Sequence, residues 1–182
     1  RIFIDPFCGP GRIQVKGETT TRHGGALIAW HQSIKSQCNF TKVIVGDIDE
    51  QKLEACRIRL QNAGANVSAF IGSAKETVPE MIKAIPYGSL CLAYLDPYNL
   101  KYLSFSIIKA LAALPKIDFV VHFSLMDLNR NIDIELGERD RFSDASPDWK
   151  IREKKESISK ANLGTWFFND WTNLIKQLGF KF

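Results

Sequence analysis

The stretch Asp5–Arg12 (DPFCGPGR) constrains the fold of this chain more than any other. It follows the apolar run Ile2–Ile4, a pattern typical of a buried β-strand that continues into a glycine-rich loop. Gly9 and Gly11 have no Cβ, so main-chain N–H groups can approach a ligand closely, and Asp5 adds a carboxylate at the strand end. A buried strand that is followed by an acid and then by a loop with two glycines predicts a cofactor site.

The same loop also favours one kind of cofactor. A dinucleotide-binding loop has the pattern G-x-G-x-x-G, whose third glycine lets the next helix aim its N-terminus at a pyrophosphate. Gln14 occupies that third position here. S-adenosylmethionine carries no phosphate but has a sulfonium, an ammonium group and a ribose diol, for which carboxylates are natural partners. The loop therefore favours S-adenosylmethionine, and a nicotinamide oxidoreductase is the least favoured hypothesis.

The composition fits a single domain over residues 1–182. Of the 182 residues, 45% are hydrophobic, which is enough for a full core. The 24 Lys and Arg against 20 Asp and Glu leave a net charge of +4, which permits a nucleic-acid partner without identifying one. The chain begins within a predicted strand and ends in residues 179–182, which resemble the start of another strand. We therefore expect a fragment that lacks elements at both ends.

The four cysteines indicate a reducing compartment. Cys8, Cys38, Cys56 and Cys91 form no C-x-x-C pair and stand among apolar or helical residues. We expect reduced, mostly buried thiols in a cytoplasmic protein, and no metal site. The sequence has no signal peptide and no apolar run of about 18 residues, so we expect no membrane partner.

Apolar segments alternate with helical patterns along the chain. Strands are predicted at residues 2–4, 40–47, 67–71, 90–95 and 119–123, and helices at 25–37, 50–62, 75–84, 102–114 and 164–178. Residues 13–24 are polar and delay the first helix, and residues 127–149 lack periodicity, which is typical of a long loop that borders a site. The alternation predicts an α/β fold with a mostly parallel, twisted sheet and helices on both faces.

Polar residues follow four of the predicted strands. A ligand of such a sheet binds at the carboxyl ends of the strands, near the point where the strand order reverses. The residues at these ends are Asp5, Asp47, Ser73 and Asp96. Because they follow successive strands, we expect them to surround one ligand.

Each strand end suits a different part of the ligand or the acceptor. Asp47 is placed to accept hydrogen bonds from both ribose hydroxyls, Ile48 to cover an adenine face, and Ser73 to bind the adenine edge. Asp96 stands where a methionine ammonium group or a substrate proton needs a carboxylate. Tyr98 is placed to stack on a planar substrate.

The sequence leaves structural interpretations of these residues open. Asp47 and Asp49 both suit a helix N-cap, and Asp96–Tyr98 suits a turn at the edge of the core. Cys8 suits packing better than nucleophilic chemistry, because no histidine is near it in the sequence. His31 and His122 in predicted elements suit the core, and the charged run Lys150–Lys155 suits a solvated face, with nucleic-acid contact as the less favoured interpretation. The aromatic segment Trp166–Trp171 suits either the core or an interface.

At these residues the chain resembles class I S-adenosylmethionine-dependent methyltransferases and, more narrowly, the three-Cys-motif partner family of bacteria and archaea. The narrower resemblance rests on the stretches Asp5–Arg12, Gly24–Ala29, Leu95–Leu100 and Asp127–Asn131. It implies a Rossmann-like class I methyltransferase fold. The family name refers to a neighbouring protein with three cysteines, which the resemblance implies as a partner.

The resemblance also implies roles for individual residues. At the methionine end of the cofactor it places Asp5, Phe7, Gly9 and Gly11, and at the ribose and adenine it places Asp47 and Ser73. Asp96, Pro97 and Tyr98 would then face the transferred methyl group. Two departures stand out: nucleic-acid amino-methyltransferases carry two prolines where Pro97 is alone, and many relatives have an acid in place of Ser73.

Two hypotheses follow from the sequence. The first is a methyltransferase that acts on a nucleic acid or another planar nitrogen or oxygen acceptor, with basic residues at the rim of the site and His23 as a further substrate contact. Those basic residues are Arg12, Lys16, Arg22 and Arg130. The second is a catalytically inactive partner protein that keeps the fold and binds its three-cysteine neighbour. The sequence makes no prediction of oligomeric state.

Overall fold

The computed structural model describes residues 1–137 and 139–181. The chain divides into two compact units. The first, the sheet unit, contains Arg1–Asp96 and Ala113–Val121. The second, the helical unit, contains Pro97–Ala112 and His122–Phe182.

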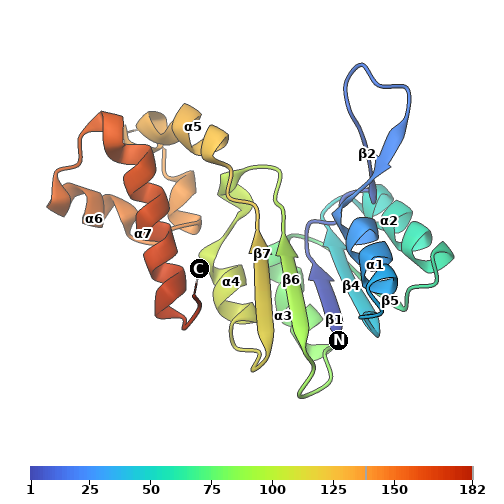
Figure 1. The fold of residues 1–182 in the computed structure, drawn as a ribbon. Helices are drawn as coiled ribbons and strands as arrows, with labels where there is room; N and C mark the ends of the chain where they lie inside the picture. Colours follow the sequence, from blue (N-terminus) through green and yellow to red (C-terminus); the bar gives the residue numbers. More distant parts are fainter. Residues whose placement is uncertain (138, 182) are drawn as a thin grey trace. The chain divides into compact units, whose positions relative to one another are not determined.

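The sheet unit is built on five parallel strands, with the order β5-β4-β1-β6-β7 (Figure 1). The strands are β1 (Ile2–Asp5), β4 (Lys42–Asp47), β5 (Val67–Ile71), β6 (Cys91–Leu95) and β7 (Ile117–Val121). The chain adds strands first on one side of β1 and then, from β6, on the other. The predicted Rossmann-like parallel α/β sheet is therefore confirmed, with its reversal point between β1 and β6.

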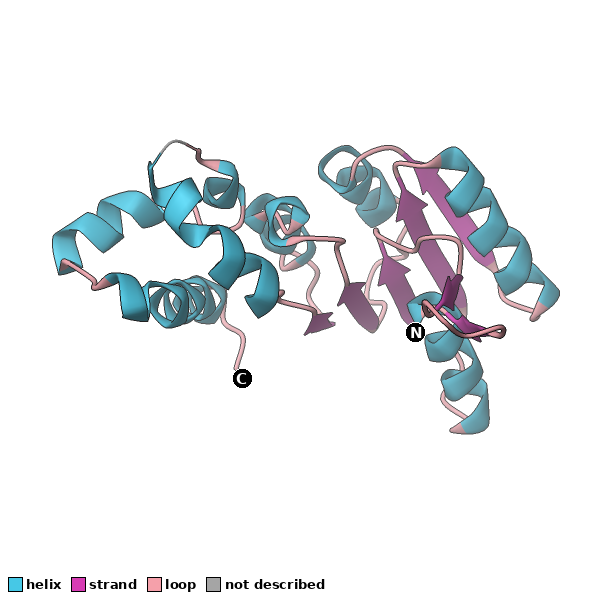
Figure 2. Cartoon of the chain, turned by 90° about the horizontal axis from the view of Figure 1, so that it is seen from above, coloured by secondary structure: helices cyan, strands magenta, loops and turns pink. Residues whose placement is uncertain are grey.

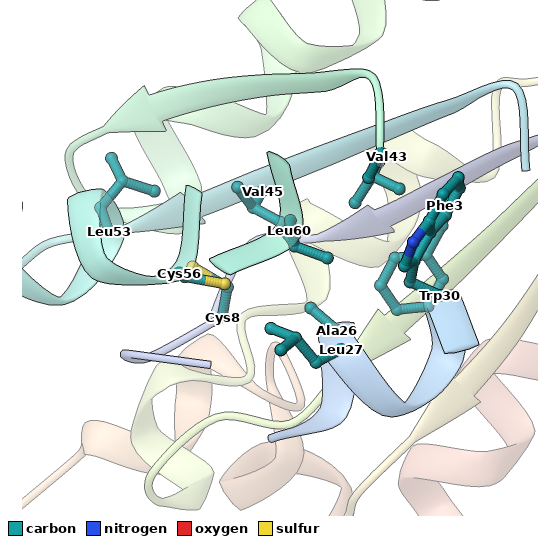
Figure 3. Close-up of a cluster of buried hydrophobic side chains, with 11 residues drawn as sticks. Phe3, Cys8, Ala26, Leu27, Trp30, Val43, Val45, Leu53, Cys56 and Leu60 are labelled. Atoms are coloured by element: carbon teal, nitrogen blue, oxygen red, sulfur yellow. The ribbon is translucent and has the colours of Figure 1, made fainter. Parts of the chain in front are cut away.

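Helices cover both faces of this sheet (Figure 2). They are α1 (Gly25–Lys35), α2 (Glu50–Asn62) and α3 (Ala74–Lys83). On one face, side chains of α1 and α2 such as Trp30 and Leu60 pack in one buried cluster with Phe3 and Val45 (Figure 3). On the other face Gly46 lies against Met81 of α3, where a Cβ on Gly46 would collide with the methionine methyl. Because both faces are covered, the four inner residues of β4, Val43–Gly46, are all buried and show no apolar–polar alternation.

Local capping signals set the starts of two helices. The Asp49 side chain accepts a hydrogen bond from the Lys52 N–H at 3.1 Å and so caps α2, as predicted. Ser73 and Glu76 form a capping box at the start of α3. Pro79 lies within α3 without ending it.

The polar stretch after the glycine loop is not irregular but forms a hairpin. Its strands β2 (Arg12–Gln14) and β3 (Thr21–His23) are antiparallel, and all six residues are exposed. Strands of three residues with no alternating apolar pattern give no periodic signal. The sequence therefore predicted the delay of the helix but not the hairpin.

The helical unit contains short 3-10 turns and four α-helices within the described residues. They are η1 (Leu100–Tyr102), α4 (Phe105–Leu111), α5 (Leu125–Gly137), η2 (Arg141–Asp144), α6 (Trp149–Glu156), η3 (Lys160–Asn162) and α7 (Leu163–Gln177). Its core is aromatic, with Phe142, Trp149, Phe167 and Trp171 buried. The aromatic segment of α7 is thus core, one of the two interpretations that the sequence left open.

The prediction of a long loop at 127–149 is wrong. The helix α5 buries Leu128, Ile132 and Glu135, spaced four and then three residues apart. Glu135 is fully buried and receives hydrogen bonds from the Arg141 Nε at 2.6 Å and the Arg141 main-chain N–H at 2.7 Å. A charged residue on the buried face removed the apolar stripe by which a helix is recognised.

Other boundaries also differ from prediction. The strand expected at 119–123 ends at Val121, because Phe123 packs in the helical unit with its ring 4.8 Å from that of Trp171. His122 is consequently exposed rather than in a buried strand. The helix expected at 102–114 is split into η1 and α4. Residues 179–181 form no strand, and residue 182 lies outside the described residues.

Within residues 1–137 and 139–181, no helix combines the length and the apolar character needed to cross a bilayer.

Candidate functional site

The predicted cofactor residues of the sheet unit gather at the carboxyl ends of its strands. Asp5 is the last residue of β1, Asp47 is the last residue of β4, and Asp96 directly follows β6. These are the central strands, on either side of the reversal point. In open α/β sheets this is the place where ligands bind.

Asp5 is a buried carboxylate with an altered proton affinity. It is 2% exposed, and its Oδ1 accepts a hydrogen bond from the Phe7 N–H at 3.0 Å. Burial, with the negative charges of Asp96 and Asp47 as smaller causes, raises the pKa of Asp5 to about 7 against the opposing effect of the Phe7 hydrogen bond. The Asp96 and Asp47 carboxylates therefore both act electrostatically on Asp5.

Asp47 ties the glycine loop to the neighbouring strand. Its Oδ2 accepts a hydrogen bond from the Gly9 N–H at 2.9 Å, and its Oδ1 accepts one from the Asp49 N–H at 2.8 Å. The Cys8 N–H adds a bond of 3.0 Å to the Gly46 carbonyl. Asp49, not Asp47, provides the side-chain cap of α2, so the helix-cap interpretation of Asp47 is wrong. Each Asp47 oxygen keeps a further lone pair for another donor.

The two glycines of the loop have different roles. Both have a positive φ, +55° at Gly9 and +70° at Gly11, which favours glycine. A Cβ on Gly9 would meet no atom within 4 Å, so the space in front of this residue is open. A Cβ on Gly11 would lie 2.7 Å from Leu27 Cδ1 and 3.2 Å from Cys56 Sγ. Gly9 therefore leaves room for a ligand, whereas Gly11 permits close packing.

Asp96 is oriented by a residue that the sequence did not single out. The Tyr94 hydroxyl donates a hydrogen bond to Asp96 Oδ2 at 3.0 Å. Burial, followed by this bond, raises the pKa of Tyr94 to about 12, so the hydroxyl keeps its proton as the donor. The Tyr94 ring lies against Gly25, where a Cβ would come within 2.6 Å of the ring. A tyrosine two residues before an acid in a buried strand was the signal available in the sequence.

The remaining residues that the sequence predicts for the cofactor lie at the same end of the sheet. Phe7 is half-buried, and Ile48 is 74% exposed directly after Asp47. The Ser73 hydroxyl donates to Glu76 Oε2 at 2.6 Å, and the Ser73 N–H donates to the same oxygen at 3.1 Å. The Ser73 hydroxyl hydrogen is thus already committed, and only its oxygen remains as an acceptor for another group.

Pro97 and Tyr98 belong to the helical unit, where Pro97 is buried and Tyr98 is 95% exposed. The segment that carries them is held by Asp127 of α5, whose Oδ2 accepts a hydrogen bond from the Leu100 N–H at 2.9 Å. The Asn131 side chain donates to both the carbonyl and Oδ1 of Asp127, each at 2.9 Å. Asp127 and Asn131 therefore position this segment, a role that the sequence did not assign to them.

Cys8 lies in the loop but is not suited to nucleophilic chemistry. It is buried beside Cys56, and their sulfur atoms are adjacent in Figure 3. The hydrogen bond with Cys56, followed by burial, raises the pKa of the Cys8 thiol far above its ordinary value. The thiol therefore stays protonated, in agreement with its interpretation as a packing residue.

In the part of the chain that the structure describes, no three His, Cys, Asp or Glu side chains group together as metal ligands. Comparison of the chain with protein-family models, with curated proteins and with solved structures returned no match.

Proposed function

We propose that the sheet unit binds S-adenosylmethionine and that the protein is a methyltransferase. The observation that carries this proposal is the convergence of Asp5, Asp47 and Asp96 at the ends of three adjacent strands, with the open space at Gly9 beside them. The cofactor supplies an electrophilic methyl group on a sulfonium. The residues of the chain bind it, exclude water and handle charge.

The acids match the charge of this ligand. The negative charge of Asp96 contributes to the raised pKa of Asp5, and a bound cation would relieve the repulsion between the two carboxylates. Asp47, already fixed by two main-chain N–H groups, has lone pairs left for the ribose hydroxyls. Phe7 and Gly9 would surround the methionine end, and Gly11 would hold the loop close to α1 and α2. Ile48 and the Ser73 oxygen would face the adenine.

Catalysis would rest on positioning and on charge. The Asp96 carboxylate, oriented by the Tyr94 hydroxyl, would stabilise the positive charge that develops on a nitrogen or oxygen acceptor as the methyl is transferred. Pro97 and Tyr98 follow Asp96 in the chain, and the exposed Tyr98 ring would stack on a planar acceptor.

The alternative is a catalytically inactive partner protein that binds a three-cysteine-motif neighbour. The single proline between Asp96 and Tyr98 favours it. The aromatic segment of α7 gives it little support, because Phe167 and Trp171 are 0% and 3% exposed within the core of the helical unit. Methyl incorporation from labelled cofactor into a cellular nucleic-acid or protein fraction, lost in Asp96→Asn, would exclude this alternative.

Calorimetry tests the cofactor proposal directly. S-adenosylmethionine should bind the wild-type protein, and Asp47→Ala should weaken binding at least tenfold because the ribose loses its acceptor. The matched control is Asp118→Ala, which removes an exposed acid from β7 and should bind like the wild type. Thermal melting identifies any variant that has lost its fold. Equal, tight binding by Asp47→Ala, or no binding by the folded wild type, would overturn the proposal.

A further inference from the structure

The hairpin of β2 and β3 is firmly anchored at the candidate site. It begins directly after Gly11, and the Gly24 N–H donates a hydrogen bond to the Gly11 carbonyl at 2.8 Å where the chain returns. A Cβ on Gly24 would lie only 3.0 Å from the Gly11 carbonyl carbon. The two glycines thus close the base of the hairpin against the cofactor loop. Figure 1 shows the hairpin projecting beyond the carboxyl ends of the strands.

Beyond that base the hairpin has no buried side chains in its strands to stabilise it. All residues of both strands are exposed, including Ile13 at 53%, and Val15 after β2 is 41% exposed. A two-stranded hairpin without a core is marginally stable in water. A hairpin of this kind is stabilised when it binds a partner, so we expect it to contact one. We call residues 12–23 the arm.

The charge of the arm is positive. Residues 12–23 contain Arg12, Lys16 and Arg22 against the single acid Glu18, which pairs with Arg22 at 2.6 Å. For Arg12 and Lys16 the described residues provide neither a hydrogen bond nor an ion pair. Two cations without partners, on a projecting element, complement a polyanion.

The arm also presents planar groups on the same face as Arg12. Arg12 and His23 are directly opposite each other in the hairpin register, so their side chains share a face. The His23 ring lies 5.1 Å from that of His31 on α1, and both residues are exposed. Exposed imidazole rings beside a guanidinium are groups on which unstacked bases stack.

We propose that the β2–β3 arm, together with His31, binds a single-stranded nucleic acid. Arg12 and Lys16 contact its phosphates, and the His23–His31 pair stacks on a base. This inference rests on the proposed function, since it assigns the acceptor of the methyl group. A single strand suits the arm because a base must leave its helical stack before it can be modified.

The test is fluorescence anisotropy of a labelled 20-nucleotide single strand of mixed sequence, titrated with the wild-type protein over a range of salt concentrations. In Arg12→Ala/Lys16→Ala the dissociation constant should rise at least tenfold. The slope of log affinity against log salt should fall by about 1.4, because each phosphate contact to a single strand contributes about 0.7. His31→Ala should weaken binding severalfold without changing the slope, because stacking does not depend on salt.

The matched control is Lys154→Ala/Lys155→Ala, which removes the same charge from the exposed basic face of α6 and should leave affinity within twofold. Equal loss in this control, preference for a duplex of the same sequence, or no binding by the wild type would overturn the inference. Cofactor calorimetry on the hairpin variant separates the two proposals. If the wild-type protein binds the cofactor but not the nucleic acid, only the inference about the arm is overturned. If it binds the nucleic acid but not the cofactor, only the proposed cofactor site is overturned.

Discussion

The two units differ in the partners that they provide for their carboxylates. In the helical unit Glu135 is held by Arg141, and Asp170 receives bonds of 2.6 and 2.7 Å from Arg152. In the sheet unit Asp5 has a main-chain N–H as its partner and two other acids as its electrostatic neighbours. The helical unit neutralises its own charges, because they are structural. In the sheet unit Asp5 instead gains proton affinity from burial and from its acidic neighbours, which supports our proposal that this site receives a cationic ligand.

The largest expected effect concerns Asp5. Its pKa is raised from 3.8 to about 7, so the folded state holds the proton more tightly than the unfolded state. The stability this provides is fully present below pH 3.8 and is lost as the pH rises through 7, by about 4 kcal/mol. Asp5→Asn, which stays neutral, should therefore be more stable than the wild type at pH 8 by a similar amount and nearly equal to it at pH 4.

Urea unfolding at the two pH values measures this difference. The exposed acid of β7 serves as the control, and Asp118→Asn should change the unfolding free energy by less than about 0.5 kcal/mol at either pH. A wild-type protein more stable than Asp5→Asn at pH 8 would mean that the carboxylate is well compensated, and the contrast between the units would disappear.

The next effect distinguishes the filled and the open parts of the glycine loop. Gly11→Ala should destabilise the protein by roughly 3 kcal/mol, because its Cβ meets Leu27 and Cys56 and its φ is +70°. Gly9→Ala should cost only about 1 kcal/mol, from its φ of +55° alone. Chemical denaturation gives both values. Equal losses would show that the space before Gly9 is not open.

A smaller loss of stability is expected when the helical unit loses an arginine that neutralises a buried carboxylate. Arg141→Ala leaves the fully buried Glu135 carboxylate without its cation and should destabilise the protein by about 2 kcal/mol, a value reduced because the arginine is partly exposed. Arg130→Ala, at an exposed position of α5, is the control and should stay within about 0.5 kcal/mol. If both variants unfold at the same urea concentration, Glu135 does not depend on Arg141.

The smallest expected effect is the number of protons that the protein releases when it binds the cofactor. With a pKa of about 7, about half of the Asp5 side chains carry a proton at pH 7 in the free protein. A bound cation favours the carboxylate, so cofactor binding should release about half a proton. Calorimetry in two buffers of different ionisation enthalpy counts these protons. Asp5→Asn should show no release, and proton uptake in the wild type would contradict the cationic ligand.

Much of the sheet unit was predictable because its signals are local. The helix α2 and the strand β5 have the predicted limits, since Asp49, Gly64 and a short apolar run mark them in the sequence itself. The helix α5 was missed because its burial depends on a pair, Glu135 with Arg141, that has no apolar periodicity. Tyr94, Asp127 and Asn131 were missed because their partners are defined by space and not by spacing.

The sequence by itself determined that this chain forms a parallel α/β sheet with acids at three of its strand ends, because strand period and strand-end residues are properties of a few neighbouring positions. Tertiary structure alone decided that Asp47 binds the Gly9 N–H, 38 residues away, and that Asp5 is desolvated beside two other carboxylates. Contacts across the sheet and the dielectric around a side chain arise only when distant segments pack together. For that reason the positions of the acids could be predicted, but the proton affinity of Asp5 could not.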